Sequence, residues 1–382
     1  MSSSIVPLTA ASLSKHGISQ QNAHFEVIAF LKKMMSPERV VTEYGRSVSE
    51  YGNMRIKASE IYFICRLAIE EFKKEPNLIN VCAPITVVGD VHGNFHDLYR
   101  AIMARNPKSS KINDSFPSVK QFVKNRYLFL GNYIEKGSRS IECICLLFAL
   151  KVCFPNNYFL LRGPYESPSQ NNSDFFGQLD FYGVHTKTLQ KSFNEAFSFM
   201  PLAAIIGKKI FCVHGGISPH LTSWDDIRKI KKPLLDPKDD ALATDLLFSD
   251  TLDYDLVHIP TSKPKYEYNI IRNISVLYNE AAVKAFCENF GIKLIIRSNM
   301  MVPFGHRFFA NKKLITIFNS TNFQDEKNYG ALLKIGGDAK ITVITLLPDG
   351  EIPEKIDINQ MPSSQVLSEL SAKGTLISKH SK

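Results

Sequence analysis

An acid and an imidazole stand two residues apart in this sequence, directly after a short apolar run. Asp90 and His92 lie in a turn that Gly89 and Gly93 bracket, and the residues before it predict a buried strand. A carboxylate and an imidazole are both good ligands for a divalent transition metal. Because α/β proteins build their sites at the carboxyl ends of strands, the pair predicts a metal-binding position at such an edge.

Other polar motifs also follow apolar runs, and periodicity predicts the elements that must position them. Strands are predicted at 83–91, 127–130, 158–161, 210–213, 293–296, 307–309, 313–318, 331–335 and 340–346. Helices are predicted at 24–35, 57–75, 138–151 and 279–290. Strands first alternate with helices and then follow one another, so the pattern indicates an α/β protein.

One domain is predicted over residues 23–354, because neither an internal repeat nor a linker interrupts 55–348. The polar, Ser-rich ends at 1–22 and 355–382 predict a disordered N-terminal tail and a flexible C-terminal tail. Residues 105–125 are polar and contain two prolines, so we expect a surface insertion there.

The composition argues against several classes of function. The net charge of +9 would suit nucleic-acid binding, but the basic residues come singly or in pairs without an aromatic–basic motif. The longest apolar run, Cys143–Leu150, is too short to span a bilayer. Seven cysteines, none in a Cys-x-x-Cys pair, indicate buried free thiols in a reducing compartment. No signal peptide is visible, so we expect a cytoplasmic or nuclear protein that binds neither nucleic acid nor membrane.

Six short motifs at predicted strand ends carry a family resemblance. They are GDVHG from Gly89, GNYIEKG from Gly131, LRGPYE from Leu161, HGG from His214, RSN from Arg297 and FNSTNF from Phe318. In this order and spacing they resemble the catalytic core of the PPP family of protein serine/threonine phosphatases, and protein phosphatase type 1 most closely, over residues 55–348. The resemblance implies the calcineurin-like metallophosphoesterase fold, a two-sheet β-sandwich flanked by helices.

The resemblance also implies a two-metal site, of which this chain keeps only a part. The retained ligand positions are Asp90, His92 and His214. Asn132 stands where the family has a carboxylate that bridges the metals, Pro164 where it has an asparagine ligand, and Asn299 where it has a histidine. A two-metal site clamps the phosphate and activates a bridging hydroxide, so the exchanges remove charge and donor atoms that both tasks need.

The groups that the resemblance places around the phosphate are altered as well. Tyr165 takes the place of the catalytic histidine, and Glu135 that of the aspartate that orients this histidine. A phenol with its ordinary pKa of about 10 is a poor acid at neutral pH. Lys136 replaces one phosphate-binding arginine, whereas Arg272 matches the second. A lysine keeps the positive charge but lacks the bidentate grip of an arginine.

These departures favour a catalytically inactive, type-1-like pseudophosphatase that acts as a protein-binding scaffold or regulator. The alternative is a weakly active, metal-dependent serine/threonine phosphatase with an altered metal site. We expect no metal, or one weakly held manganese, iron or zinc ion at Asp90 and His92. We also expect Asn132 and Asn299 to form hydrogen bonds into the site in place of a second metal.

Type 1 phosphatases bind short extended motifs of regulatory proteins in an apolar groove remote from the metals. The matching positions in this chain are Ile210, Leu294, Phe308, Ile341 and Ile344, all of them apolar. A peptide in such a groove adds a strand and fills alternate pockets. The resemblance therefore implies regulatory proteins or phosphoproteins as partners, although apolar positions in predicted strands usually belong to the core.

Overall fold

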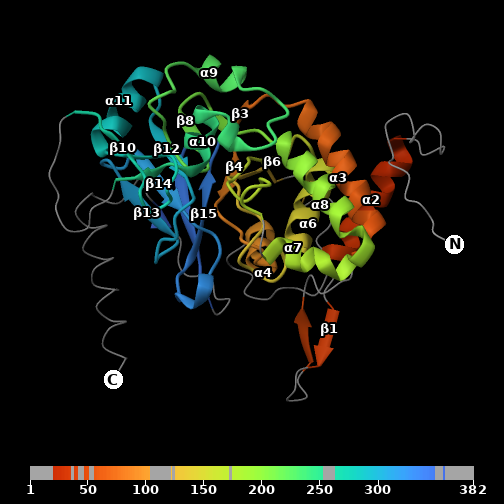
Figure 1. Cartoon of the computed structure of the whole chain (residues 1–382). Helices are drawn as coiled ribbons and strands as arrows, with labels where there is room; N and C mark the ends of the chain where they lie inside the picture. The colour runs from red at the N-terminus through yellow and green to blue at the C-terminus, as the bar shows by residue number, and fades with distance from the viewer. Residues whose placement is uncertain are drawn as a thin grey trace.

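Two six-stranded sheets lie face to face at the centre of the computed structural model, and helices cover the outer face of each sheet (Figure 1). The structure describes residues 20–35, 38–41, 47–50, 56–103, 122, 125–171, 174–252, 263–348 and 356–357. This architecture is the two-sheet α/β sandwich that the sequence predicts, so the fold class is confirmed.

Sheet 1 has the strand order β13-β14-β12-β8-β7-β3. Its strands are β3 (Leu78–Val81), β7 (Ala203–Ile206), β8 (Ile210–Val213), β12 (Leu294–Arg297), β13 (His306–Phe309) and β14 (Leu314–Ile317). Strand β12 pairs in parallel with both β8 and β14, so these three strands end at the same edge of the sheet. Strand β13 lies at the side of the sheet and pairs antiparallel with β14.

Sheet 2 has the strand order β17-β16-β15-β4-β5-β6. Its strands are β4 (Ile85–Val88), β5 (Tyr127–Phe129), β6 (Tyr158–Leu160), β15 (Gly330–Ile335), β16 (Ile341–Leu346) and β17 (Ile356–Asp357). Strands β4, β5 and β6 are parallel and therefore also end together. An isolated bridge between Asp90, after β4, and Phe318, after β14, joins the two sheets at this edge.

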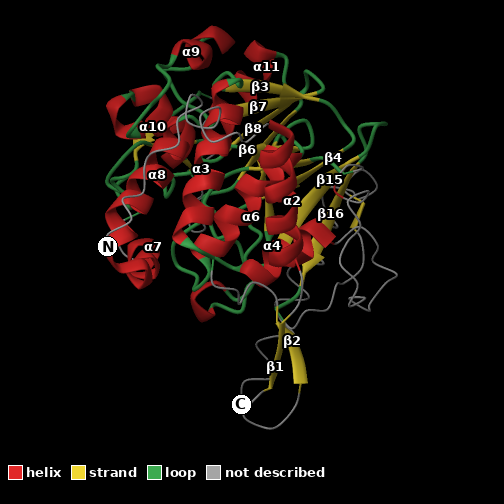
Figure 2. Ribbon diagram, turned by 90° about the vertical axis from the view of Figure 1, so that its right-hand side faces the viewer, coloured by secondary structure: helices red, strands yellow, loops and turns green. Residues whose placement is uncertain are grey.

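Helices on the two outer faces connect these strands. Sheet 2 is covered by α2 (Gln20–Met35), α3 (Ala58–Lys73), α4 (Phe95–Met103), α6 (Ser140–Cys153), α7 (Asp174–Leu179) and α8 (Thr186–Ser198), most of which Figure 2 shows side by side. Sheet 1 is covered by α9 (Trp224–Lys229), α10 (Ala241–Phe248) and α11 (Glu280–Phe290). Helix α11 begins after the Asn279 cap and ends at Gly291, whose φ of 64° is a left-handed helix end.

Short elements complete the chain. They are the 3-10 turns η1 (Asp180–His185), η2 (Pro237–Asp239) and η3 (Phe323–Asp325), the small sheet of β9 (Asp250–Thr251), β10 (Tyr266–Tyr268) and β11 (Val276–Tyr278), and the hairpin of β1 (Glu38–Val41) and β2 (Ser47–Glu50). Turn η3 follows β14 and contributes Phe323 to the site.

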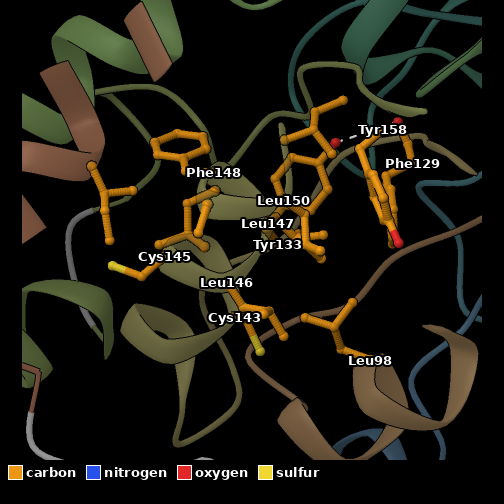
Figure 3. Packing of buried hydrophobic residues seen from close by; sticks show 14 of the residues in the cluster. Leu98, Phe129, Tyr133, Cys143, Cys145, Leu146, Leu147, Phe148, Leu150 and Tyr158 are labelled. Atoms are coloured by element: carbon orange, nitrogen blue, oxygen red, sulfur yellow. Dashed lines mark hydrogen bonds between the residues drawn. The ribbon is translucent and has the colours of Figure 1, made fainter. Parts of the chain in front are cut away.

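The largest apolar cluster lies between sheet 2 and its helices, and α6 is its centre. This helix is apolar on nearly all sides, which is typical of a helix that other elements surround completely. Figure 3 shows its side chains Cys143, Cys145, Leu146, Leu147, Phe148 and Leu150 packed among Leu98, Phe129, Tyr133 and Tyr158. The seven cysteines are free; six are buried as expected, whereas Cys82 is exposed.

The predicted elements are present, with differences at their ends. The strand expected at 83–91 is limited to β4, because the Gly-bracketed turn begins at once after it. Helix α2 begins at Gln20, inside the tail predicted at 1–22, and β17 pairs with β16 inside the tail predicted at 355–382. The rest of both tails and nearly all of 105–125 lie outside the described residues. Within the described part of the chain, no helix is long and apolar enough to cross a membrane.

Replacing Phe148 by alanine should lower the free energy of unfolding by about 3–5 kcal/mol, as expected when a buried aromatic side chain is truncated. Its ring is fully buried and contacts Phe72 and Phe197 edge-on, with centroids 5.6 and 6.1 Å away. Replacing the exposed Phe181 by alanine is the matched control and should change stability by less than about 0.5 kcal/mol. Urea unfolding measures both variants, and equal losses would contradict this view of the core.

Candidate functional site

The polar residues of the sequence motifs gather at the edge where the two sheets are joined. Sheet 2 contributes Asp90, Asn132 and Tyr165, which follow β4, β5 and β6. Sheet 1 contributes His214 and Asn299, which follow β8 and β12. The bridge between the sheets fixes these strand ends relative to one another, so segments far apart in the sequence form one site.

The Asp90 carboxylate is the centre of this site and is almost fully buried. Its Oδ2 accepts a hydrogen bond from the Asn132 Nδ2 at 2.8 Å and lies 3.0 Å from the His92 Nε2. Its Oδ1 accepts hydrogen bonds from the Ser298 hydroxyl and from the Asn299 backbone N–H, the latter at 3.1 Å. Protein groups thus contact both carboxylate oxygens, and Asn132 forms a hydrogen bond into the site as expected.

Hydrogen bonds keep Asp90 ionised. Burial alone would raise the pKa of this carboxyl, but His214, His92 and the Ser298 hydroxyl outweigh burial and hold the pKa well below its usual range. Burial lowers the pKa of His214 to about 4, so the positive charge of this imidazole favours the ionised Asp90 only in acid. At neutral pH, where His214 is uncharged, the hydrogen-bond donors around Asp90 stabilise its negative charge.

Each retained imidazole has one nitrogen without a hydrogen-bond partner among the described residues. His214 donates from Nδ1 to the Leu130 carbonyl at 3.0 Å, because a carbonyl can only accept, and its buried Nε2 is unpaired. His92 directs Nε2 at Asp90, and its buried Nδ1 is unpaired. Buried polar atoms normally have partners, so two unpaired nitrogens in one site are unusual, although other buried side chains of the described residues, such as Ser249, also have an unpaired atom.

Three aromatic rings enclose the imidazole of His92. The ring of Phe323 is tilted against it at a centroid distance of 4.7 Å, and that of Phe318 lies 5.7 Å away. The ring of Tyr165 meets it edge-on at 5.5 Å. Tyr165 thus packs against a retained ligand position as part of an aromatic wall.

The residues at the other altered positions have partners of their own. Glu135 accepts hydrogen bonds from the backbone N–H groups of Asp174 and Phe175, at 3.1 and 3.3 Å, at the start of α7. Lys136 is exposed, and its Nζ lies 6.0 Å from the centre of the Tyr165 ring. Burial raises the pKa of Tyr165, so its phenol stays protonated at neutral pH.

A second buried acid, Asp250, organises the part of the site that sheet 1 provides, and sequence reasoning missed it. It forms ion pairs with Arg297, at 2.6 Å, and with Arg272. Its Oδ1 also accepts a hydrogen bond from the Asn299 Nδ2 at 3.2 Å. Arg272 in addition donates from Nη2 to the Asn299 carbonyl at 2.6 Å. The predicted phosphate-binding Arg272 is thus held by protein acceptors on two of its nitrogen atoms.

Glu166 is another site residue that sequence reasoning missed, as is Ser298. Its buried carboxylate accepts backbone hydrogen bonds from Asn132 and Tyr133, both at 2.8 Å, and from Gly163 at 2.9 Å. It ties together the loops after β5 and β6, which run so close that a Cβ on Gly131 would lie 2.5 Å from the Gly163 nitrogen. Burial raises the pKa of Glu166 to about 7, although the three N–H donors favour its charged form.

The donor set does not fit a pair of divalent metals. Asn132 is neutral, and both ends of its amide are engaged by hydrogen bonds. Pro164 has no side-chain donor atom, and Asn299 directs its amide nitrogen at Asp250. Without a bridging carboxylate, two dications within a few ångström repel each other strongly. No group of three or more His, Cys, Asp and Glu side chains within the described ranges is arranged to hold a metal ion.

Four of the five predicted docking residues lie together, at the opposite edge of the sandwich. Ile210 and Leu294 begin β8 and β12, the strands that His214 and Asn299 follow at their other ends. Ile210, Leu294, Phe308 and Ile341 pack at the cluster between the sheets, and all but Ile210 are only partly buried. These side chains therefore reach the surface far from Asp90.

The fifth docking prediction, Ile344, is wrong. Ile344 packs into the cluster between sheet 2 and its helices, whereas Ile341 faces the cluster between the sheets. Residues an odd number of positions apart point to opposite faces of a strand, so the two cannot line one groove. Val343 is the β16 residue that shares a face with Ile341.

Replacing Glu166 by glutamine should lower the free energy of unfolding by about 1–3 kcal/mol. An amide nitrogen cannot accept a hydrogen bond, so at least one of the three buried backbone N–H groups would lose its acceptor. Replacing the exposed Glu288 by glutamine is the control and should have almost no effect. Urea unfolding tests both, and a Glu166 variant as stable as the unaltered protein would show that the loops do not need this carboxylate.

The fold has counterparts in known proteins. The sequence matches the calcineurin-like phosphoesterase family over residues 83–300, more than half of the chain. A protein serine/threonine phosphatase from Saccharomyces cerevisiae, described as similar to human phosphatase PP5, matches with a TM-score of 0.62 and 23% identity over 81% of this chain and 92% of that one. A cold-active protein-tyrosine phosphatase of a psychrophilic Shewanella species matches with a TM-score of 0.54 and 14% identity over 85% and 98% of the two chains. The chain therefore belongs to the calcineurin-like phosphoesterase family.

Proposed function

We propose that this chain is a catalytically inactive phosphatase of the PPP type, a pseudophosphatase that binds proteins instead of dephosphorylating them. Its main support is the Asp90 carboxylate, whose two oxygens contact Asn132, His92, Ser298 and Asn299. In a working two-metal site a carboxylate at this position would bind metal. Here the same atoms are satisfied by donors of the protein.

The remaining cations support the loss of activity. Arg272 and Arg297 both form ion pairs with Asp250, so the protein itself holds both guanidinium groups, and this carboxylate offsets one of their two positive charges. Lys136 is exposed and close to Tyr165, but a single lysine does not replace two dications. A phosphate dianion that entered the site would also meet the Asp90 carboxylate and be repelled by it. Because Asp90 repels a phosphate group in the site, we expect partners to bind elsewhere on the surface.

We predict that the protein does not hydrolyse p-nitrophenyl phosphate, phosphoserine peptides or phosphothreonine peptides above background, with or without added manganese. The reason is the missing bridging carboxylate at Asn132 and the missing acid at Tyr165. Replacing Asp90 by alanine should therefore leave the background rate unchanged. Manganese-dependent turnover that the Asp90 variant loses would overturn the proposal.

A repaired variant provides the positive control. It carries Asn132→Asp, Pro164→Asn, Tyr165→His and Asn299→His, which restore the charge, donor atoms and acid of the family pattern. Elemental analysis after dialysis against manganese should find more metal in the repaired variant than in the unaltered protein. Equal manganese contents at a ratio of two ions per chain, as expected of a working pair, would contradict the proposal.

A weakly active phosphatase with one metal is the second candidate. The unpaired Nδ1 of His92 and Nε2 of His214 favour it, because both nitrogens are able to bind a metal ion. One weakly held ion near Asp90 would then support slow hydrolysis. The same two measurements separate the candidates, since this one requires bound metal together with turnover that depends on it.

The apolar residues at the opposite edge support a scaffold role. Of these, Leu294, Phe308 and Ile341 are partly buried, and β13 has a pairing partner on one side only among the described strands. An extended peptide can therefore add to β13 and place apolar side chains against these residues. Ile210 and His214 are four positions apart along and just after β8, a span of about 13 Å at the usual rise per residue. Changes at one edge need not disturb the other.

Replacing Phe308 by aspartate should weaken binding of a labelled Val-x-Phe peptide by about tenfold or more, because the variant puts a charge into an apolar docking surface. Replacing Tyr165 by tryptophan, at the opposite edge, is the control and should leave binding unchanged. Fluorescence anisotropy measures the affinities, with an Ala-x-Ala peptide as the negative probe. A cooperative melt must first show that each variant is folded. A folded Phe308 variant with unchanged affinity would rule out this groove.

A further inference from the structure

Phe323 covers His92 from a loop whose backbone is unusual. The loop follows β14 and includes the short turn η3. The ring of Phe323 packs against His92 at a centroid distance of 4.7 Å, yet Phe323 itself is only partly buried. One face of this ring therefore contacts the site, and the residue as a whole lies at the boundary with solvent.

Four residues around Phe323 have left-handed backbone conformations. Their φ angles are 48° at Asn322, 50° at Gln324, 66° at Asp325 and 54° at Lys327, and none is a glycine. Side chains disfavour this conformation, although asparagine tolerates it better than most residues. Such a cluster persists only where the surroundings hold it in place. The loop over His92 is thus held away from its relaxed backbone conformation.

Both ends of the loop are fastened. The buried Asn328 accepts a hydrogen bond from the Phe323 N–H at 2.7 Å and donates to the Ser320 carbonyl at 2.8 Å. On the other side, the Thr321 N–H donates to the Asp97 carboxylate at 2.6 Å. Because Thr321 and Asn328 are anchored, any movement that relieves the left-handed residues is confined to the segment between them and breaks the hydrogen bond from the Phe323 N–H to Asn328.

We propose that Phe323 is a movable plug that controls access of solvent and ligands to His92 and Asp90. In the closed position, its ring gains aromatic contact with His92. The same position maintains four left-handed residues and leaves the buried Nδ1 of His92 without a hydrogen-bond partner. Lifting the ring relaxes the loop and lets water reach this nitrogen. The aromatic contact favours the closed position, whereas the left-handed residues and the unpaired nitrogen favour the open one. The plug can therefore adopt both positions.

The plug controls access to the site of the proposed function. The inference depends on that function in one respect, namely that the site is taken to be catalytically inactive. Its test reads access to His92 and uses no activity measurement. Inactivity of the protein and movement of the plug can therefore be confirmed or refuted separately.

Reaction with diethyl pyrocarbonate at a fixed pH, followed by peptide mass spectrometry, measures access to the His92 imidazole. Replacing Phe323 by alanine removes the ring, so His92 should react roughly tenfold faster than in the unaltered protein, the order of change expected for a lost aromatic contact. The exposed His220 serves as an internal reference and should react at the same rate in every sample.

A second variant tests the loop from the opposite direction. Replacing Gln324 by glycine favours the left-handed conformation at this position, so it should stabilise the closed plug and slow the reaction of His92. Opposite effects of these two neighbouring substitutions would establish the plug. If His92 in the folded Phe323 variant reacts no faster than in the unaltered protein, or if the Gln324 variant reacts as fast as the Phe323 variant, the inference is wrong.

Discussion

The burial of one carboxylate, that of Asp90, constrains the whole site. A charge removed from water must be compensated by hydrogen bonds or by opposite charge. Here the donors come from Asn132 after β5 and from Ser298 and Asn299 after β12, so they belong to different sheets. The contacts that keep Asp90 charged therefore also hold the two sheets together. Asn132 suits this position for two reasons. Its amide donates a hydrogen bond to Asp90, and asparagine tolerates the backbone φ of 54° that this position has.

The fold was largely predictable because apolar runs and glycine-bracketed turns are local signals. Glu166, Ser298 and Asp250 were not found, because their roles depend on partners distant in the sequence. Ser298, for example, meets Asp90 across 208 positions. The Ile344 error has another origin: on a strand, a register error of one position exchanges the two faces. Sequence patterns thus indicated which segments meet at the site, but not which atoms pair there.

The charged groups of the site have partners within the protein. Asp250 forms ion pairs with both Arg272 and Arg297, and Glu135 is engaged by the first turn of α7. These groups are thus held in place by the protein itself. The proposed docking residues have a different character, since they are apolar side chains, and Ile210 and Leu294 stand at the beginning of strands that end in the site. Strands β8 and β12 therefore join two surfaces that depend on different interactions.

The loops after β5 and β6 lie so close together that a Cβ on Gly163 would be 2.4 Å from the Asn132 nitrogen. Glu166 fastens both loops through backbone groups, so the path of the chain does not depend on which side chains the loops display. Side chains that point into the site can therefore differ without a change of the backbone, whereas a side chain on Gly131 or Gly163 would collide with the neighbouring loop. The fold of an enzyme can therefore persist after its catalytic side chains have been replaced. A family match of such a chain reports a shared backbone, whereas activity depends on the side chains at this edge.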